Sequence, residues 1–410
     1  MQIDEDQSHY NFKEKETYLH SKEDILNEKV NQTLNSIIRK EGYKTFEIDR
    51  KIFKDNENGF LGVLCEIDIK GRTDDVEKET NIFVKLKPPG DQVAMLSLSN
   101  AYLRELYVYK ELSIIYTDLQ NEFDVPEKER YTFAKFYDAS DKDAMIMENL
   151  CRKGFKIYHR MDVVSLEFAE LAVKELAKFH ALSFVLQKTN PVYFQRKLAV
   201  IKQPLIFNDH WNLMLNKICN ATVSFLDEGL KKKFETFITR HLKMYKKYLE
   251  DDSCICCICH GDYRPANIMK KEIDGKISKI IPIDFQLIYY GSPIHDFLYF
   301  IFGATDQKFR RTHINYLKEL YYKEISHFLL YFDINVETVL PLTKFEEVFR
   351  ERLDFGLMSS VVLLPHILAS DEAVPDLASG EDLEFNTEIS EVFKKRMIEL
   401  IEDFIEWGYL

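Results

Sequence analysis

The chain has 410 residues, of which 46% are apolar and 30% charged, and 68 Asp and Glu against 55 Lys and Arg give a formal net charge of -13. A chain of this length can bury a hydrophobic core without disulfide bonds or structural metal ions. The length predicts two or three domains, or one two-lobed body. The acidic balance argues against the net basic surface that nucleic acids and anionic membranes require, so we expect neither as a partner, although a local basic site for a phosphate remains open. No secretory signal or membrane span of ~20 apolar residues is visible, so we expect a cytoplasmic protein.

The first part of the chain mixes helical and strand patterns. The helical stripe that begins at Ser21 ends before Gly42, a residue typical of helix ends. Two strand-like segments flank an acidic loop that contains Gly71, which predicts an antiparallel pair. We expect a helix over 21–40, a strand pair over 60–69 and 80–85, a second helix over 102–112 and a short strand over 144–147.

After residue 150 the pattern becomes mostly helical. Ser165 can cap a long helix over 166–186, more helical material spans 200–250, and Thr387 can cap a C-terminal helix. These patterns predict an α+β protein with a small, sheet-containing N-terminal lobe over 1–148 and a larger, mainly helical lobe over 149–410.

Four of the seven cysteines crowd together immediately before His260, at positions 254, 256, 257 and 259. A metal cluster is one interpretation, and a buried strand with small side chains is the other. Because side chains on a strand alternate between its faces, Cys254 and Cys256 are expected on one face and Cys257 and Cys259 on the other. Four ligands on opposite faces cannot converge on one tetrahedral ion, so the pattern favours the strand.

The segment His260-Gly-Asp-Tyr-Arg-Pro-Ala-Asn267 precedes an expected β-hairpin. Asp274-Gly275 is a strong two-residue turn signal, and the apolar residues on each side predict two strands. If the turn centres on these two residues, Asn267 lies opposite Pro282, and Asp284 lies two residues further along on the same face. We therefore expect the Asn267 and Asp284 side chains roughly 7 Å apart at one end of the hairpin.

An amide oxygen and a carboxylate at this spacing can share hard cations such as magnesium, and Asp262 can point into the same space. Phosphoryl transfer needs this set, because one carboxylate takes the proton of the acceptor hydroxyl while an Asn and a second Asp hold the magnesium ions of the nucleotide. The alternative is a surface turn that merely contains Asp and Asn. The order of Asp262, Asn267 and Asp284 around a hairpin favours the catalytic interpretation.

The pattern His-Gly-Asp, four residues, Asn, and then Ile283-Asp-Phe-Gln286 resembles the aminoglycoside and choline phosphotransferases, and in particular the ecdysteroid kinase-like group. Gly291-Ser-Pro293 with Asp296, and the segments 147–150 and 176–180, extend the resemblance. It implies a bilobal protein-kinase-like fold, ATP and Mg²⁺ as cofactors, and a small-molecule hydroxyl as the acceptor. It also implies that Asp262 is the catalytic base and that Asn267 and Asp284 are the metal ligands.

The resemblance further implies a nucleotide site in the first lobe. Lys85 resembles the strand lysine that touches the phosphates, and Glu105 resembles the helix glutamate that pairs with that lysine. The hinge that offers backbone groups to adenine would be Glu148, Asn149 and Leu150. The turn that covers the nucleotide would carry Gly59 and Gly62, although it keeps only a reduced form of the family pattern.

Three other features have simpler interpretations. Asp354-Phe355-Gly356 is a literal Asp-Phe-Gly motif, but it lies in an apolar helical pattern far beyond Asp262, so we interpret it as helix packing. We expect His260 to fix the catalytic loop by hydrogen bonding, because Asp262 already supplies the base. His180 lies on the apolar face of a helix and is expected to be a core histidine.

Three functions remain open. The first is an ATP-dependent kinase for an ecdysteroid or another lipophilic alcohol, as the resemblance implies. The second keeps the chemistry but takes a cationic amino alcohol or aminoglycoside, and the third is a nucleotide-binding pseudokinase that acts as an interaction module. Apolar walls for an acceptor could come from aromatic and Met side chains that could equally belong to the core: Phe207, Trp211, Phe225, Phe355 and Met358.

Overall fold

The computed structural model describes residues 28–53, 64–87, 95–140, 143–369 and 390–410. The expectations for Ser21, Gly59, Gly62 and Thr387 lie outside these residues. The chain divides into two compact units, of which one is Met1–Pro89 with Ala134–Lys153 and the other is Gly90–Phe133 with Gly154–Leu410.

This division differs from the expected boundary after residue 148, because residues 90–133 belong to the second unit. The reason is aromatic packing. Tyr109 makes an edge-to-face contact with Phe285 at 5.7 Å between ring centroids, and Tyr116 makes one with Phe179 at 6.0 Å. The helices that carry these tyrosines are thus part of the core of the second unit.

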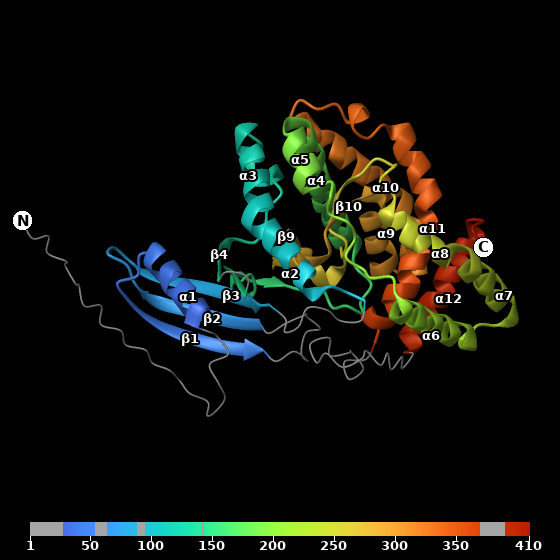
Figure 1. The fold of residues 1–410 in the computed structure, drawn as a ribbon, viewed down its shortest axis with the longest axis horizontal. Helices are drawn as coiled ribbons and strands as arrows, with labels where there is room; N and C mark the ends of the chain where they lie inside the picture. Colours follow the sequence, from blue (N-terminus) through green and yellow to red (C-terminus); the bar gives the residue numbers. More distant parts are fainter. Residues whose placement is uncertain (1–27, 54–63, 88–94, 141–142, 370–389) are drawn as a thin grey trace, which may run out of the picture. The chain divides into compact units, whose positions relative to one another are not determined.

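The first unit is a five-stranded antiparallel sheet with one helix, in the strand order β1-β2-β3-β5-β4. Figure 1 draws it in blue and green. Apolar residues of α1, such as Leu34 and Ile37, pack with Ile67, Ile69 and Ile82 of the sheet in one buried cluster. The bounds are α1 Glu28–Lys40, β1 Thr45–Phe53, β2 Leu64–Arg72, β3 Glu77–Leu86, β4 Phe136–Ser140 and β5 Ala144–Glu148.

The expected antiparallel pair is confirmed as β2 and β3, and the strand at 144–147 is confirmed as β5. Both strands of the pair run further towards each other than expected, so that Gly71 lies within β2 and not in the loop. A Cβ at Gly71 would lie 2.0 Å from the carbonyl oxygen of Thr45, which shows how closely β1 approaches. The sequence analysis did not predict β1, because charged residues interrupt its alternation.

The second unit is mainly helical (Figure 1). Its helices are α2 Leu98–Tyr107, α3 Ser113–Glu122, α4 Leu166–Thr189, α5 Pro191–Lys197, α6 Asp209–Phe225, α7 Glu228–Phe237, α8 Lys243–Glu250, α9 Pro293–Ala304, α10 Gln307–Leu330, α11 Leu342–Ile367 and α12 Glu391–Glu406. Two small sheets join β6 Phe155–Lys156 with β8 Ile268–Ile273 and β9 Lys276–Pro282, and β7 Cys257–Cys259 with β10 Tyr289–Gly291. The expected α+β class, with a sheet in the first part and a mainly helical second part, is confirmed.

The core of the second unit surrounds α9, where nearly every side chain is buried. The Asp-Phe-Gly motif lies inside α11, and its Gly356 lets α11 approach α9 closely, since a Cβ there would lie 2.4 Å from the ring of Phe302. The expectation of helix packing is thus confirmed. None of the described helices is long and apolar enough to cross a membrane.

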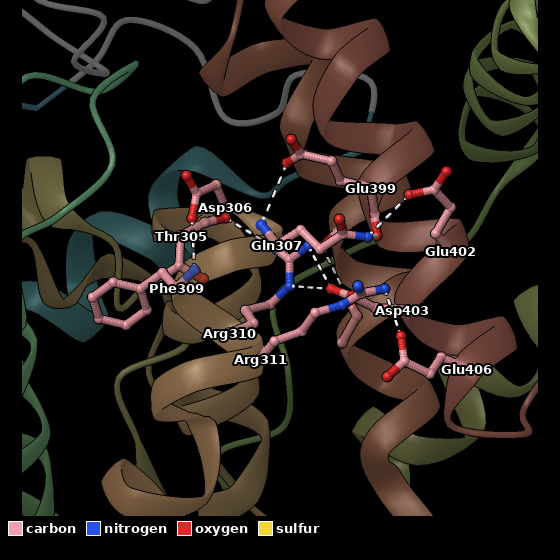
Figure 2. Close-up of polar contacts among 12 residues, drawn as sticks. Thr305, Asp306, Gln307, Phe309, Arg310, Arg311, Glu399, Glu402, Asp403 and Glu406 are labelled. Carbon is pink, nitrogen blue, oxygen red and sulfur yellow. Dashed lines mark hydrogen bonds and ion pairs between the residues drawn. The ribbon is translucent and has the colours of Figure 1, made fainter.

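A buried ion pair joins α10 to α12, as Figure 2 shows. Arg310 Nε donates to Asp403 Oδ2 at 2.9 Å, and both side chains are fully buried. Asp403 Oδ1 accepts a second bond from Arg311 Nε at 2.9 Å, and Arg310 also donates to the Thr305 carbonyl at 2.7 Å. The pair therefore fixes the C-terminal helix to the start of α10.

We expect Asp403→Ala to lower the free energy of unfolding by about 3–5 kcal/mol, because it leaves the Arg310 guanidinium buried without its counter-charge. The measurement is urea unfolding followed by circular dichroism. Glu406→Ala is the matched control, since its pair with Arg311 is solvent-exposed and should contribute no more than about 1 kcal/mol. Equal effects of the two substitutions would contradict this prediction.

Candidate active site

The expected hairpin is present, but its register shifts at a bulge. Next to the turn, Ile273 faces Lys276 as expected. Ser278 is an extra residue on β9, so the pairing shifts by one position beyond it, and Lys271 faces Lys279. Ile268 therefore faces Pro282, and the Asn267 carbonyl accepts from the Ile283 N–H at 2.9 Å. The predicted pairing of Asn267 with Pro282 is wrong by one residue.

The bulge changes how the two predicted metal ligands are positioned. Asn267 ends a short 3-10 turn, Pro265–Asn267, before β8 begins. Asp284 follows β9 in a left-handed conformation, with φ 66° and ψ 65°, so it is not part of the strand. A non-glycine residue in this conformation is uncommon and is typical of functional sites, and Asp and Asn tolerate it best.

The His-Gly-Asp sequence has a geometric reason. Gly261 has φ +81°, and a Cβ there would lie 2.1 Å from the Leu287 carbonyl oxygen, so only glycine fits. His260 Nε2 donates to the Ile283 carbonyl at 3.1 Å, and its Nδ1 faces the Asp262 N–H at 3.4 Å. Burial lowers the pKa of His260, so the ring is neutral and these roles are consistent with one tautomer. The predicted positioning role of His260 agrees with this geometry.

Asp296 on α9 holds the loop of residues 260–267, the predicted catalytic loop, in place. Its carboxylate accepts from the backbone N–H of His260 at 2.5 Å and of Gly261 at 2.9 Å. His180 Nε2 donates to the same carboxylate at 3.1 Å, while its Nδ1 contacts the Tyr321 hydroxyl at 2.6 Å. Burial alone would raise the pKa of Asp296, but these hydrogen bonds hold it below its ordinary value. His180 is a core residue as expected, and its role is to orient Asp296.

Asp262 is almost completely buried, and both of its carboxylate oxygens are contacted. Asn267 Nδ2 donates to Oδ2 at 2.7 Å, and Arg264 Nε donates to the same oxygen at 3.2 Å. Oδ1 accepts a short hydrogen bond from the hydroxyl of Tyr299, which lies on α9. Burial raises the pKa of Tyr299 well above its ordinary value, so its hydroxyl is a neutral donor. The structure thus brings Asp262 and Asn267 into direct contact.

The donor set fits a hard cation. Asn267 uses its amide nitrogen on Asp262, and its Oδ1 is buried without a hydrogen-bond partner. A buried amide oxygen left unpaired is costly unless something else binds it. Asp284 is buried as well, and Gln286 Nε2 donates to its Oδ2 at 3.3 Å. An amide oxygen and a carboxylate are the ligands that magnesium prefers.

A cavity of about 40 Å³ lies beside the catalytic loop, within the second unit. Its lining includes Gly261, which directly precedes Asp262, and Tyr299, whose hydroxyl bonds Asp262 Oδ1, so the cavity reaches Asp262 through these two neighbours. The other walls are largely aromatic and aliphatic and include Tyr245, Leu249, Tyr289, His295 and Phe355.

Of the five residues expected as acceptor walls, Phe355 lines this cavity. Trp211 and Phe207 lie behind it, where Trp211 stacks on Tyr245 at 5.8 Å and Phe207 packs against Trp211 at 4.9 Å. Met358 is fully buried in α11 and is a core residue, whereas Phe225 is half-buried and makes an edge-to-face contact with Phe393 of α12.

The predicted nucleotide residues fall in both units. Lys85 is buried on β3 of the first unit, and Glu105 is buried on α2 of the second. In the predicted hinge, the Glu148 N–H donates to the Lys135 carbonyl and the Asn149 N–H to the Asn81 carbonyl. None of the described backbone hydrogen bonds uses the Leu150 N–H.

The four clustered cysteines separate into two groups. The sulfur atoms of Cys254 and Cys256 are 3.5 Å apart. The other group consists of Cys257, Cys259 and His180, whose sulfur and ring-nitrogen atoms lie within 4.8 Å of one another. Both ring nitrogens of His180 are already hydrogen-bonded, so this group is better explained by core packing than by a metal site.

A profile of the ecdysteroid kinase-like family matches residues 56–332, which include the hairpin and the catalytic loop. The chain belongs to this family. The match confirms the resemblance indicated by the His-Gly-Asp pattern. It places the ecdysteroid kinase-like chain among small-molecule kinase-like phosphotransferases.

Solved structures with similarity to the chain have low sequence identity. A protein from Ralstonia eutropha, provisionally assigned as an aminoglycoside phosphotransferase, is 13% identical, with 92% of this chain and 98% of that chain covered and a TM-score of 0.44. An aminoglycoside phosphotransferase from Streptomyces rimosus, in complex with ADP and streptomycin, is 14% identical, with coverage of 72% and 90% and a TM-score of 0.33. The choline kinase LicA from Streptococcus pneumoniae is 11% identical, with coverage of 71% and 88% and a TM-score of 0.32. A search among curated proteins gives no match.

The sequence analysis did not identify the roles of Tyr299, Arg264 and Asp296 in this ecdysteroid kinase-like site. Asp296 had a signal, because a carboxylate within an otherwise apolar helix must be paired when it is buried. Tyr299 follows His295 at the i+4 position on the same face of α9, but nothing in the sequence shows that this face meets Asp262.

Proposed function

We propose that the chain is an ATP-dependent kinase that phosphorylates a hydroxyl group of a neutral, lipophilic alcohol of the ecdysteroid class, in the cytoplasm. The observation that carries the proposal is the position of Asp262, a buried carboxylate contacted by Asn267 and adjacent to an aromatic cavity. The family match supports the reaction type.

In the proposed reaction, the acceptor hydroxyl enters the cavity and hydrogen-bonds Oδ1 of Asp262, the oxygen that also accepts from Tyr299. Asp262 orients this hydroxyl and takes its proton as the oxygen attacks the γ-phosphorus, while the bond from the γ-phosphorus to the β–γ bridging oxygen breaks and ADP leaves. Arg264 and Asn267 hold Oδ2, so the carboxylate has one fixed orientation. Asp296 keeps the whole loop in place through the His260 and Gly261 amides.

Lys85 and Glu105 are proposed as the phosphate clamp, and the hinge Glu148, Asn149 and Leu150 as the adenine site. Gly59 and Gly62, which lie outside the described residues, are proposed to cover the nucleotide. Asn267 and Asp284 would hold Mg²⁺, which when bound neutralises the nucleotide phosphates. The buried, unpartnered Oδ1 of Asn267 supports this assignment.

The cavity supports a neutral acceptor over a cationic one. Asp296 is the carboxylate among its described lining residues, and its oxygens already accept from two backbone amides and His180. The Phe355 ring of this cavity is not free to form part of a cation-binding cage. The Phe355 ring stacks on the His295 ring, with 4.3 Å between centroids and 25° between planes. It also stacks on the Tyr245 ring, with 5.3 Å between centroids and 3° between planes. The two faces of the Phe355 ring are thus covered, and a cation needs a ring face.

The experiment incubates the protein with labelled ATP, magnesium and separate acceptors: ecdysteroids, choline and aminoglycosides. We expect label on an ecdysteroid and not on the cationic alcohols. Label on choline or an aminoglycoside instead would support the second acceptor class. Saturable ATP binding without transfer to any acceptor would favour a nucleotide-binding module and would contradict the proposed enzyme.

A further inference from the structure

Cys254 and Cys256 form a close dithiol just before β7. Their sulfurs are 3.5 Å apart, which is contact distance for two sulfur atoms. Cys254 is partly exposed, whereas Cys256 is buried. The preceding turn is fixed, because Asp251 Oδ1 accepts from the Ser253 N–H at 3.0 Å and from its hydroxyl at 2.5 Å. The two thiols are therefore held together by local backbone structure, with one of them accessible to small molecules.

Arg352 of α11 provides a second, independent observation. Its side chain is buried, pairs with Asp251 through one nitrogen, and has its other terminal nitrogen, Nη1, without a hydrogen-bond partner. This nitrogen is a buried donor that can still bind an anion or a water molecule. The hydrogen bond between the two thiols, together with the Arg352 charge, lowers the pKa of Cys254 to about 7 against the opposing effects of burial and Asp251. The same hydrogen bond and burial raise the pKa of Cys256.

We propose that Cys254 and Cys256 are a reversible thiol–disulfide site, with Cys254 as the attacking thiol and Cys256 as the resolving thiol. The oxidant is a low-molecular-weight disulfide of the glutathione class. The Cys254 thiolate attacks one sulfur of this disulfide, whose S–S bond breaks and releases one thiolate. Cys256 then loses its proton and attacks the Cys254 sulfur, which expels the second thiolate. Overall, two protein thiols are oxidised to one disulfide and the small disulfide is reduced to two thiols.

The position of this dithiol connects it to the active site. Cys256 directly precedes β7, and the catalytic loop follows β7 at His260. Arg352 lies one turn from Phe355 on α11, and Phe355 lines the cavity beside Asp262. A disulfide between residues separated by one position closes a small ring, and strained disulfides are the ones that are easily reduced. These properties suit a reversible site more than a structural bridge.

The test uses the full-length protein in a series of glutathione and glutathione disulfide ratios, followed by acid quenching, alkylation of the remaining thiols and peptide mass mapping. We expect a Cys254–Cys256 disulfide that forms at oxidising ratios and is reversed by dithiothreitol. At pH 7, iodoacetamide should modify Cys254 of the reduced protein about tenfold faster than Cys151, because about half of a thiol with a pKa near 7 is thiolate. Cys151 is the matched control, since it is exposed but has a raised pKa.

Two variants assign the roles of the thiols without using enzyme activity. Cys256→Ser should accumulate a stable mixed disulfide with glutathione at Cys254, and Cys254→Ser should slow oxidation of Cys256 at least about tenfold. A stable mixed disulfide at Cys254 in the unmodified protein would overturn the proposal, as would alkylation of Cys254 no faster than that of Cys151. These outcomes do not depend on the proposed kinase reaction, so either proposal can fail alone.

Discussion

Asp262→Asn is expected to lower the turnover number at least about 10²-fold, because it removes the carboxylate that we propose as the base for the acceptor hydroxyl. The amide keeps nearly the shape of the carboxylate, and one of its atoms can still face Asn267 and Arg264. Magnesium-dependent nucleotide binding should therefore persist. The measurements are steady-state transfer from labelled ATP and calorimetric titration with a non-hydrolysable ATP analogue.

Asp274→Asn is the matched control for this substitution. Asp274 lies in the turn of the same hairpin at φ 52°, a conformation that Asn also tolerates, and its side chain is exposed. It should leave turnover unchanged. Unchanged turnover in Asp262→Asn would show that Asp262 is not the base. Loss of nucleotide binding in the same variant would show that the substitution disrupts the structure of the site and not only proton transfer.

The sequence predicted the parts of the site that depend on local structure. The Asp274-Gly275 turn, the order of Asp262, Asn267 and Asp284, and the cap of α4 at Ser165 follow from short-range patterns. The register did not follow, because a two-residue turn fixes pairing only until the next bulge. Ser278 is stabilised as the extra residue by a hydrogen bond to the Lys271 carbonyl, which no local propensity predicts.

The contacts missed by the sequence analysis join segments far apart in the chain. Tyr299 lies 37 positions from Asp262, and His180 lies 116 positions from Asp296. Which buried donor meets which carboxylate depends on how α4 and α9 pack, and hydrophobic periodicity gives the buried face of a helix but not its partner. A buried carboxylate such as Asp296 predicts that partners exist, and only the fold identifies them.

Asp284→Asn is expected to weaken magnesium-dependent nucleotide binding and to lower turnover by about 10²-fold, since changes in the groups that only orient metal ligands already cost about 10- to 100-fold and this one changes a proposed ligand itself. The substitution replaces a negatively charged ligand by a neutral one. Asn adopts the left-handed backbone of this position as readily as Asp, so the fold should not change. The measurement is titration of the ATP analogue at a series of magnesium concentrations, with the thermal midpoint as the folding control.

This variant separates the two carboxylates of the site by their different roles. Asp262→Asn should lose turnover while the magnesium dependence of nucleotide binding stays intact, whereas Asp284→Asn should shift that dependence to higher magnesium concentrations. Asn267 already directs its amide nitrogen at Asp262, which leaves its Oδ1 as the remaining ligand and insufficient to hold the ion alone. An unaltered magnesium dependence in Asp284→Asn, with an unaltered thermal midpoint, would show that the ion is held by other groups.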